Sequence, residues 1–162
     1  MLTQKDWLLV ANMRQNSREN LTTISRRTGI PVSTIYDHVR QQTGLLYIKH
    51  VALLNFGRLG FGTKVYMLIR TPKQNREHLQ TFLELHWNVN TLFKVNNGYD
   101  FGAECVFKDV SALEEFLHKL EDEHGVKELE VHYVLEELKR EAFLADPATV
   151  QYVANERNAG HK

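Results

Sequence analysis

The sequence predicts an α+β protein with an N-terminal helix-turn-helix domain and a C-terminal ferredoxin-like (βαββαβ) domain. Two observations support this prediction. Two short amphipathic segments flank a Gly-Ile-Pro break in TTISRRTGIPVSTIYDHVR, residues 22–40, and they predict two helices joined by a tight turn. Farther along the chain, the patterns follow the order strand–helix–strand–strand–helix–strand.

The first predicted helix begins after Thr3, whose side chain is of the type that caps a helix N-terminus. Asp6 stands three residues later, so that the two side chains can form a capping box. This helix is expected to continue to about residue 14. Asn20 then caps a second, short helix over residues 21–28, in which Ile24 lies on the apolar face.

A tight turn is predicted between the second and third helices. Gly29 can adopt the positive φ that ends a helix, and Pro31 can begin the next helix without losing a needed N–H. The third helix is expected over residues 32–42, with Ile35 and Val39 facing the core. A supporting helix followed by two helices around a glycine turn is the helix-turn-helix arrangement.

The outward face of the third helix carries side chains that suit DNA. Residues 1–50 hold seven Lys or Arg against three Asp or Glu, a net +4, whereas the rest of the chain sums to −4. A protein-binding helical hairpin would show the same apolar spacing, but the glycine at the turn and the local positive charge favour DNA. The predicted contacts to base edges and phosphates come from Ser33, Thr34, Tyr36, Asp37, Arg40 and Gln41 of the third helix, and from Arg18, Arg26 and Arg27 before it.

The rest of the chain is expected to start with a β-rich connector over residues 45–62, which contains apolar residues and turn signals. The segments beyond it alternate between strand and helix patterns. Strands are expected over 63–71, within 90–109 on both sides of a turn at 96–98, and over 127–138, whose end also fits a helix; helices are expected over 75–87 and 111–125.

These elements divide the chain into four parts. Residues 1–44 form the DNA-binding helix-turn-helix domain, 45–62 the connector, and 63–140 the ferredoxin-like domain, which is expected to dimerise. Residues 141–162 are a polar C-terminal tail, which is either loose or an arm for a partner. Because the two helices of the second domain cover one sheet face, apolar residues on the other face predict a homodimer or a higher homo-oligomer.

Over roughly residues 2–138, the arrangement resembles the Lrp/AsnC (feast/famine) family of transcriptional regulators. The matching stretches are ISRRTGIPVSTIYDHVR, LGFG before the first sheet strand, NNGYDF at the hairpin and GVKELEVHYVL at the last strand. The resemblance implies a sequence-specific regulator that binds semi-palindromic double-stranded DNA as a homo-oligomer. It also implies that the domain over residues 63–140 senses a ligand, namely an amino-acid effector that is contacted or sensed at Gly98, Tyr99 and Asp100. Pro31 departs from the family pattern, which more often has a hydroxyl cap before the third helix.

The hairpin residues also have a purely structural interpretation. Gly98 can supply the positive φ of an Asn-Gly turn, and Asp100 can cap that turn. In the functional interpretation, Asp100 accepts hydrogen bonds from an ammonium group and the turn amides meet a carboxylate. The sequence leaves both interpretations open.

Several other function classes are not indicated. The eight histidines lack the i, i+4 spacing of a helical metal site, and no catalytic or cofactor motif is present, so no enzyme, metal or cofactor is expected. A single cysteine, Cys105, and the lack of an apolar run near ~20 residues predict a cytoplasmic protein without disulfides or a membrane span. Two alternatives stay open: a sensor or interaction protein without specific DNA binding, and a tetrapyrrole-acting enzyme of the same two-domain shape, using His132 and Arg70.

Overall fold

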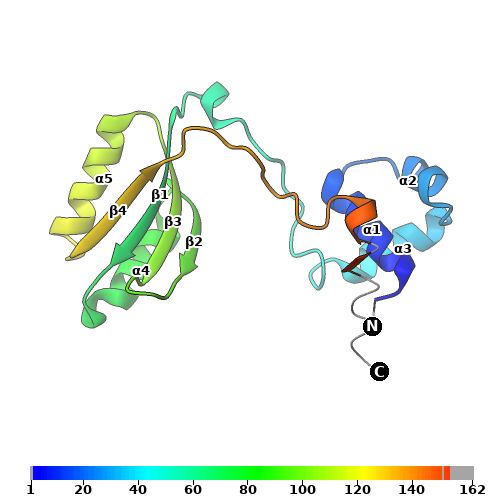
Figure 1. The fold of residues 1–162 in the computed structure, drawn as a ribbon, viewed down its shortest axis with the longest axis horizontal. Coiled ribbons are helices and arrows are strands. Elements are labelled where there is room, and N and C mark those ends of the chain that lie inside the picture. Colours follow the sequence, from blue (N-terminus) through cyan, green and yellow to red (C-terminus); the bar gives the residue numbers. More distant parts are fainter. Residues whose placement is uncertain (1, 151, 154–162) are drawn as a thin grey trace. The chain divides into compact units, whose positions relative to one another are not determined.

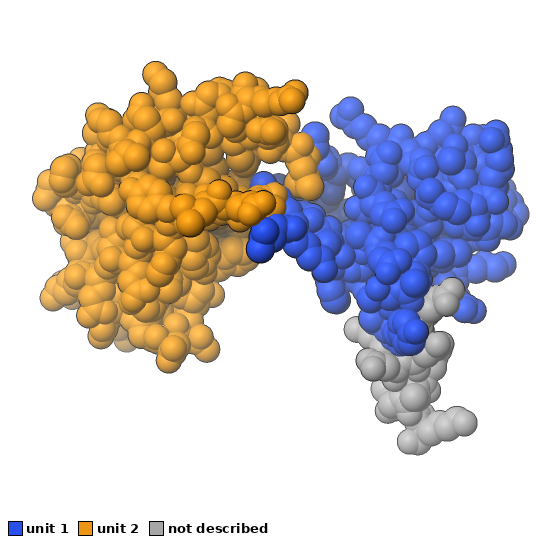
Figure 2. All heavy atoms as spheres, turned by 45° about the horizontal axis from the view of Figure 1, so that its top comes forward, with its two compact units in different colours: residues 1–52, 138–162 blue, residues 53–137 orange. Residues whose placement is uncertain are grey.

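The computed structural model describes residues 2–150, 152 and 153. The chain forms two compact units, which Figure 2 shows in different colours. The first unit combines the residues up to 52 with the C-terminal segment from residue 138, and the second spans residues 53–137. Among the described residues, none of the helices is long and apolar enough to cross a membrane.

Three helices form the N-terminal part of the first unit: α1 (Gln4–Gln15), α2 (Leu21–Thr28) and α3 (Val32–Gln42). Their bounds agree with the predicted ones to within one residue. The predicted caps are present, because Thr3 and Asp6 form a reciprocal capping box and the Asn20 side chain accepts from the backbone N–H of α2. The helices enclose a small core that consists of Leu9, Met13, Ile24, Ile30 and Ile35.

The turn between α2 and α3 has the predicted backbone geometry. Gly29 adopts a φ of 72°, in the left-handed region, and its N–H donates to the carbonyl oxygen of Ser25 over 2.8 Å. Ile30 is only 3% exposed and packs into the core of the three helices. Pro31 precedes α3 and provides no side-chain cap, in agreement with its missing hydroxyl.

The C-terminal segment was expected to be either loose or an arm for a partner, and its described part packs against α1 of the same chain. The Arg14 guanidinium donates to the carbonyl oxygens of Glu141, over 2.8 Å, and Phe143, over 3.1 Å. Val150 is 1% exposed and packs beside Trp7. The hydrogen-bonded partners stand 127 and 129 positions apart in the chain, so no local pattern could have predicted the contact.

The segment over residues 45–62 contains no strand, which corrects the expected β-rich connector. Thr43 and Tyr47 form one isolated bridge, and Phe56–Leu59 forms a short 3-10 helix. Apolar side chains of the segment lie in solvent, and Ile48 is 86% exposed. A strand needs a neighbouring strand for its backbone hydrogen bonds, and none of the described residues provides one here.

The second unit has the predicted βαββαβ order (Figure 1). Its elements are β1 (Thr63–Arg70), α4 (Arg76–Leu85), β2 (Val89–Lys94), β3 (Phe101–Phe107), α5 (Val110–Asp122) and β4 (Glu128–Tyr133). The strands form one antiparallel sheet in the order β2-β3-β1-β4, as expected for a ferredoxin-like unit. The last strand ends at Tyr133 rather than near residue 138, and no helix follows directly.

Alternation along the strands gives the sheet two different faces. One face is covered by α4 and α5 (Figure 1), and together they bury the main core, which includes Val65, Met67, Ile69, Leu79, Leu83, Cys105, Phe107, Leu113 and Phe116. The opposite face, which we call the outer sheet face, carries Tyr66, Leu68 and Phe93 in half-buried or exposed positions. This confirms that apolar side chains remain on the face that the helices leave uncovered.

Candidate functional site

The outer face of α3 lies at the surface of the first unit. Ile35 is fully buried and Val39 is half-buried, and both hold the inner side of α3 against the core. All the predicted contact residues of this helix are exposed, namely Ser33, Thr34, Tyr36, Asp37, Arg40 and Gln41. A helix with its side chains is about 10–12 Å across, so an exposed polar helix face of this kind fits the major groove of B-DNA, which is about 12 Å wide.

His38 lies on the inner side of α3 and ties this helix to its neighbours. Its Nδ1 lies 3.0 Å from the Asp6 carboxylate of α1, and its Nε2 lies 3.3 Å from the Tyr47 hydroxyl. Burial and the nearby Asp6 raise the pKa of Tyr47 to about 12. Burial also acts to raise the pKa of Asp6, but hydrogen bonds from Thr3 and the neighbouring His38 lower it overall. These residues therefore fix the position of α3.

The three arginines expected near phosphates have different surroundings. All three residues, Arg18, Arg26 and Arg27, are exposed. Arg27 also donates to Asn12, with its Nε 2.9 Å from the amide oxygen, and forms an ion pair with Glu19. Since Asn12 is only 1% exposed, Arg27 satisfies a buried acceptor on α1. The structure thus gives Arg27 a role in joining α1 to α2. The phosphate contact expected of Arg27 stays a prediction.

The β2–β3 hairpin brings the predicted effector residues to one end of the sheet. Asn97 and Gly98 have φ values of 62° and 97°, as an Asn-Gly turn requires. One Asp100 oxygen accepts from the Thr71 N–H over 2.9 Å, and the other lies 2.8 Å from the Arg76 guanidinium. Asp100 therefore connects the start of β3 to the end of β1 and the start of α4. This is a structural role, but it differs from the expected one, because these contacts of the Asp100 side chain go to Thr71 and Arg76 and not to the hairpin turn.

Tyr99 links the same hairpin to β4. Its hydroxyl donates to the Glu130 carboxylate, and this hydrogen bond is the main cause of the raised pKa of Tyr99. The bond from Tyr99, together with a second one from His132, lowers the pKa of Glu130. Tyr99 and Asp100 thus contact charged side chains, Glu130 and Arg76.

A basic pocket, which the sequence did not predict, lies beside the partners of Asp100. It has a volume of about 370 Å³ and is lined by Arg70, Thr71, Pro72, Lys73, Arg76, Lys127 and Glu128. Cationic side chains outnumber the single carboxylate, so the pocket favours an anionic group. The sequence feature that could have predicted this pocket is the stretch RTPKQNR at residues 70–76, which places three cationic side chains around the end of the first sheet strand.

Two of the eight histidines meet between the helices of the second unit. The Nδ1 atoms of His78 and His124 are 3.2 Å apart. His124 is 5% exposed, and its pKa is lowered by burial first and by His78 second. Within the described part of the chain, no group of three or more His, Cys, Asp or Glu side chains could hold a metal ion.

Arg70 and His132, the residues expected in a tetrapyrrole-acting enzyme, do not come together. Arg70 pairs with Glu128 at 3.0 Å, and His132 lies 3.2 Å from Glu130. In the sheet register His132 stands opposite Tyr66, so that it is displaced from Arg70 by roughly 13 Å along β1. The two side chains therefore contact different glutamates at separate places on the surface.

Comparison with known proteins defines the class to which this architecture belongs. An uncharacterized HTH-type transcriptional regulator from Pyrococcus abyssi is 30% identical over 124 residues, which are 67% of this chain and 83% of the relative. This similarity places the chain, with its three N-terminal helices and its ferredoxin-like second unit, among the helix-turn-helix transcriptional regulators.

The family follows from a family model, and two solved structures share the fold. The family model of the Lrp/AsnC ligand binding domain matches residues 64–143. A transcriptional regulator from Neisseria meningitidis in complex with L-Met has a similar structure, with a TM-score of 0.79, 21% identity, and coverage of 86% of this chain and 94% of that chain. For AsnC from E. coli the TM-score is 0.71 and the identity 15%, with coverage of 86% and 96%. The chain belongs to the Lrp/AsnC family of transcriptional regulators.

Proposed function

We propose that this regulator binds a specific double-stranded DNA sequence as a homodimer or a higher homo-oligomer, and that an amino acid modulates this binding. The observation that supports specific binding is the polar, exposed face of α3 above the fully buried Ile35. A helix held in this way can present hydroxyl, amide and guanidinium groups to base edges in the major groove. The L-Met bound to the Neisseria relative supports an amino-acid effector.

Base contacts and phosphate contacts are expected from different parts of the first unit. Ser33, Tyr36 and Arg40 lie on the outer face of α3 and are assigned to base edges. Arg18 and Arg26, which are exposed at the flanks, are assigned to phosphates. The purified protein should first be used to select DNA from a random pool, with and without amino acids.

The selected operator and a scrambled duplex then separate the two roles in a salt series. Ser33→Ala is expected to cost ~1–3 kcal/mol on the operator and little on the scrambled duplex. Arg26→Ala is expected to weaken both duplexes alike and to flatten the salt slope by about one unit. Equal affinity of the unmodified protein for both duplexes would contradict specific binding and favour the sensor alternative.

The outer sheet face is the proposed interface between two copies of the chain. Leu68 lies there beside Tyr66 and Phe93, and a second sheet would remove these apolar side chains from water. Leu68→Glu should shift the sedimentation coefficient toward that of the monomer, whereas Lys108→Glu, at an exposed position after β3, should not. An unchanged assembly in the Leu68→Glu variant would contradict this interface.

The proposed effector site combines the hairpin with the basic pocket beside it. Asp100 has carboxylate lone pairs beyond those used for Thr71 and Arg76 and can accept from an ammonium group, while Lys73 can pair with a carboxylate. An amino acid should therefore raise the thermal stability of the protein. Lys73→Ala should reduce this effect, and Lys94→Ala, on an exposed part of β2, should preserve it. The absence of any stabilisation by amino acids would contradict this site.

A further inference from the structure

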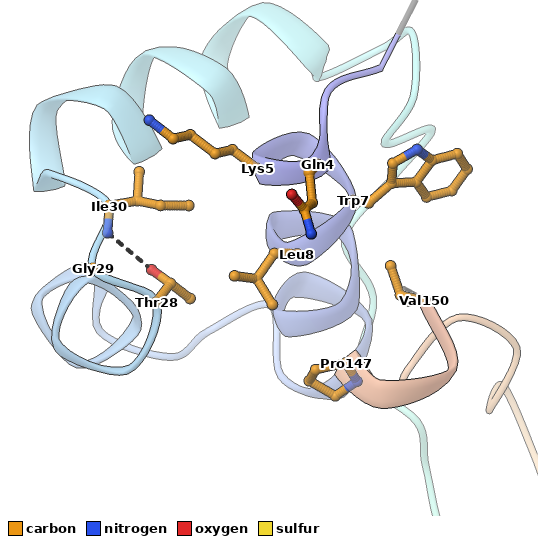
Figure 3. Close-up of a pocket in the computed structure, with 9 residues that line it drawn as sticks. All are labelled: Gln4, Lys5, Trp7, Leu8, Thr28, Gly29, Ile30, Pro147 and Val150. Carbon is orange, nitrogen blue, oxygen red and sulfur yellow. Dashed lines mark hydrogen bonds between the residues drawn. The ribbon is translucent and has the colours of Figure 1, made fainter. Parts of the chain in front are cut away.

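The first unit contains a cavity that the function proposed above does not use. It has a volume of about 220 Å³ and lies among α1, the turn from α2 to α3, and the C-terminal segment. Figure 3 shows Thr28 and Ile30 of the turn across an open space from Leu8 of α1. We call this space the turn cavity.

The C-terminal segment forms part of the cavity wall through Pro147 and Val150. Its position is held by the hydrogen bonds from Arg14 and by the packing of Val150, which is 1% exposed, on α1. Asp146 stabilises the local backbone of this segment, because its carboxylate accepts a hydrogen bond from the Ala148 N–H over 3.0 Å. The cavity is therefore built from three separate segments whose positions are fixed by contacts of their own.

Most of the side chains that line the turn cavity are apolar, and one is cationic. Leu8, Ile30, Pro147 and Val150 supply apolar surface. Lys5 is the charged lining residue, and it forms no ion pair with the residues that the structure describes. Gln4 beside it can donate a further hydrogen bond.

The size and charge of the cavity restrict what can enter it. An apolar cavity of about 150 Å³ accommodates benzene, so this larger one has room for a branched or aromatic side chain with a small polar group. A carboxylate can meet the Lys5 ammonium at the rim. An ammonium group would find no acidic partner, because none of the described lining residues is Asp or Glu.

We propose that the turn cavity binds a small apolar carboxylic acid that has no amino group. Such a ligand would touch Ile30 and the backbone of Gly29, which leads directly into α3. Occupancy would restrain the turn and change DNA binding. This effect on DNA rests on the proposed function of α3, whereas the binding itself does not.

Tryptophan fluorescence provides a direct measurement. The chain has two tryptophans, of which Trp7 borders the cavity and Trp87 is 74% exposed in the second unit. In a Trp87→Phe background, isovalerate and phenylacetate should change the Trp7 emission in a saturable manner. Isopentylamine, isoamyl alcohol and leucine should bind about tenfold more weakly or not at all. Equal responses to acid and amine, or no saturation by either acid, would overturn the proposal.

Substitutions of residues that line the turn cavity test whether the acid binds there. Lys5→Gln, which changes an exposed side chain, should weaken acid binding about threefold to fivefold, as expected for a solvated ion pair. Leu8→Phe should fill the space and abolish binding, with the melting temperature checked in parallel. The matched control Lys108→Gln and the effector-site variant Asp100→Asn should both retain it. Unchanged affinity in both Lys5→Gln and Leu8→Phe would overturn the assignment to this cavity.

The measurement is made without DNA, so that its failure can be distinguished from failure of the proposed function. If the protein binds its operator but none of the acids, only the proposal that the turn cavity is a ligand site is wrong. If acids bind, the operator affinity of the unmodified protein should change when they saturate the cavity, and the Leu8→Phe variant should not respond. An unchanged operator affinity at saturation would overturn the regulatory part of the inference.

Discussion

Replacing Arg27 by alanine should destabilise the first unit rather than weaken a DNA contact. The Arg27 guanidinium donates to the amide oxygen of Asn12, and it pairs with Glu19 at the end of the loop before α2. The neighbouring Arg26 is exposed and serves as a matched control, because Arg26→Ala removes the same charge one residue away. The two variants should therefore separate a structural role from an electrostatic one.

The expected loss in the free energy of unfolding is about 2 kcal/mol. The Asn12 side chain also donates to the Leu8 carbonyl over 2.7 Å, and at 1% exposure it has little access to water. Leaving its oxygen without a donor costs about 1–3 kcal/mol. The ion pair with Glu19 adds at most about 1 kcal/mol, since the Arg27 side chain is 45% exposed. For Arg26→Ala the expected change lies within about 0.5 kcal/mol.

Urea unfolding followed by Trp7 emission measures this difference. Trp7 is 8% exposed and reports on the first unit, and Trp87→Phe removes the signal from the second unit. With a urea slope of about 2 kcal/mol per molar, Arg27→Ala should lower the unfolding midpoint by roughly 1 M. Its affinity for the selected operator, measured under conditions where it is folded, should fall less than that of Arg26→Ala.

One result would refute this reasoning. If Arg27→Ala unfolds at the same urea concentration as the unmodified protein and loses DNA affinity as much as Arg26→Ala, the bond to Asn12 contributes nothing measurable. Arg27 would then be a phosphate contact, as its position in the sequence suggested. A loss of stability that appears equally in Arg26→Ala would also contradict the role given to Asn12.

Three further changes are predicted from the structure. Because burial and His78 lower the pKa of His124 below its ordinary value of 6.5, the unfolded chain takes up more protons than the folded one as the pH falls through that value. The stability of the second unit should therefore be complete above about pH 6.5 and decline below it, and His124→Phe should flatten this dependence in urea unfolding; an unchanged pH dependence would exclude His124 as its cause. Gly29→Ala should cost about 1 kcal/mol from its φ of 72° alone, since no atom from beyond the adjoining residues of the chain lies within 4 Å of the added methyl group. Gly29→Asn should cost less, and an equal loss of stability in both variants would point to another cause. Burial raises the pKa of the Cys105 thiol to about 12, so iodoacetamide should label the single cysteine of the chain only as the second unit unfolds, and rapid labelling of the native protein would contradict its burial.

Local chemistry determined the helices of the first unit, and these were predictable from the sequence. The cap at Thr3 and Asp6, the cap at Asn20 and the turn at Gly29 depend on groups that are at most four positions apart. Periodicity likewise predicted the order of strands and helices in the second unit, because the side-chain spacing of each element is set by its own backbone.

Contacts between distant parts of the chain decided the rest. The connector lacks strands because none of the described residues provides a neighbouring strand for its backbone hydrogen bonds. His78 contacts His124 only because α4 and the end of α5 lie together. The C-terminal segment packs on α1 through partners that no spacing rule relates. The neighbouring residues Arg26 and Arg27 also differ only through tertiary contacts. Their side chains are chemically identical, and only the packing of α1 against α2 places the buried oxygen of Asn12 beside one of them.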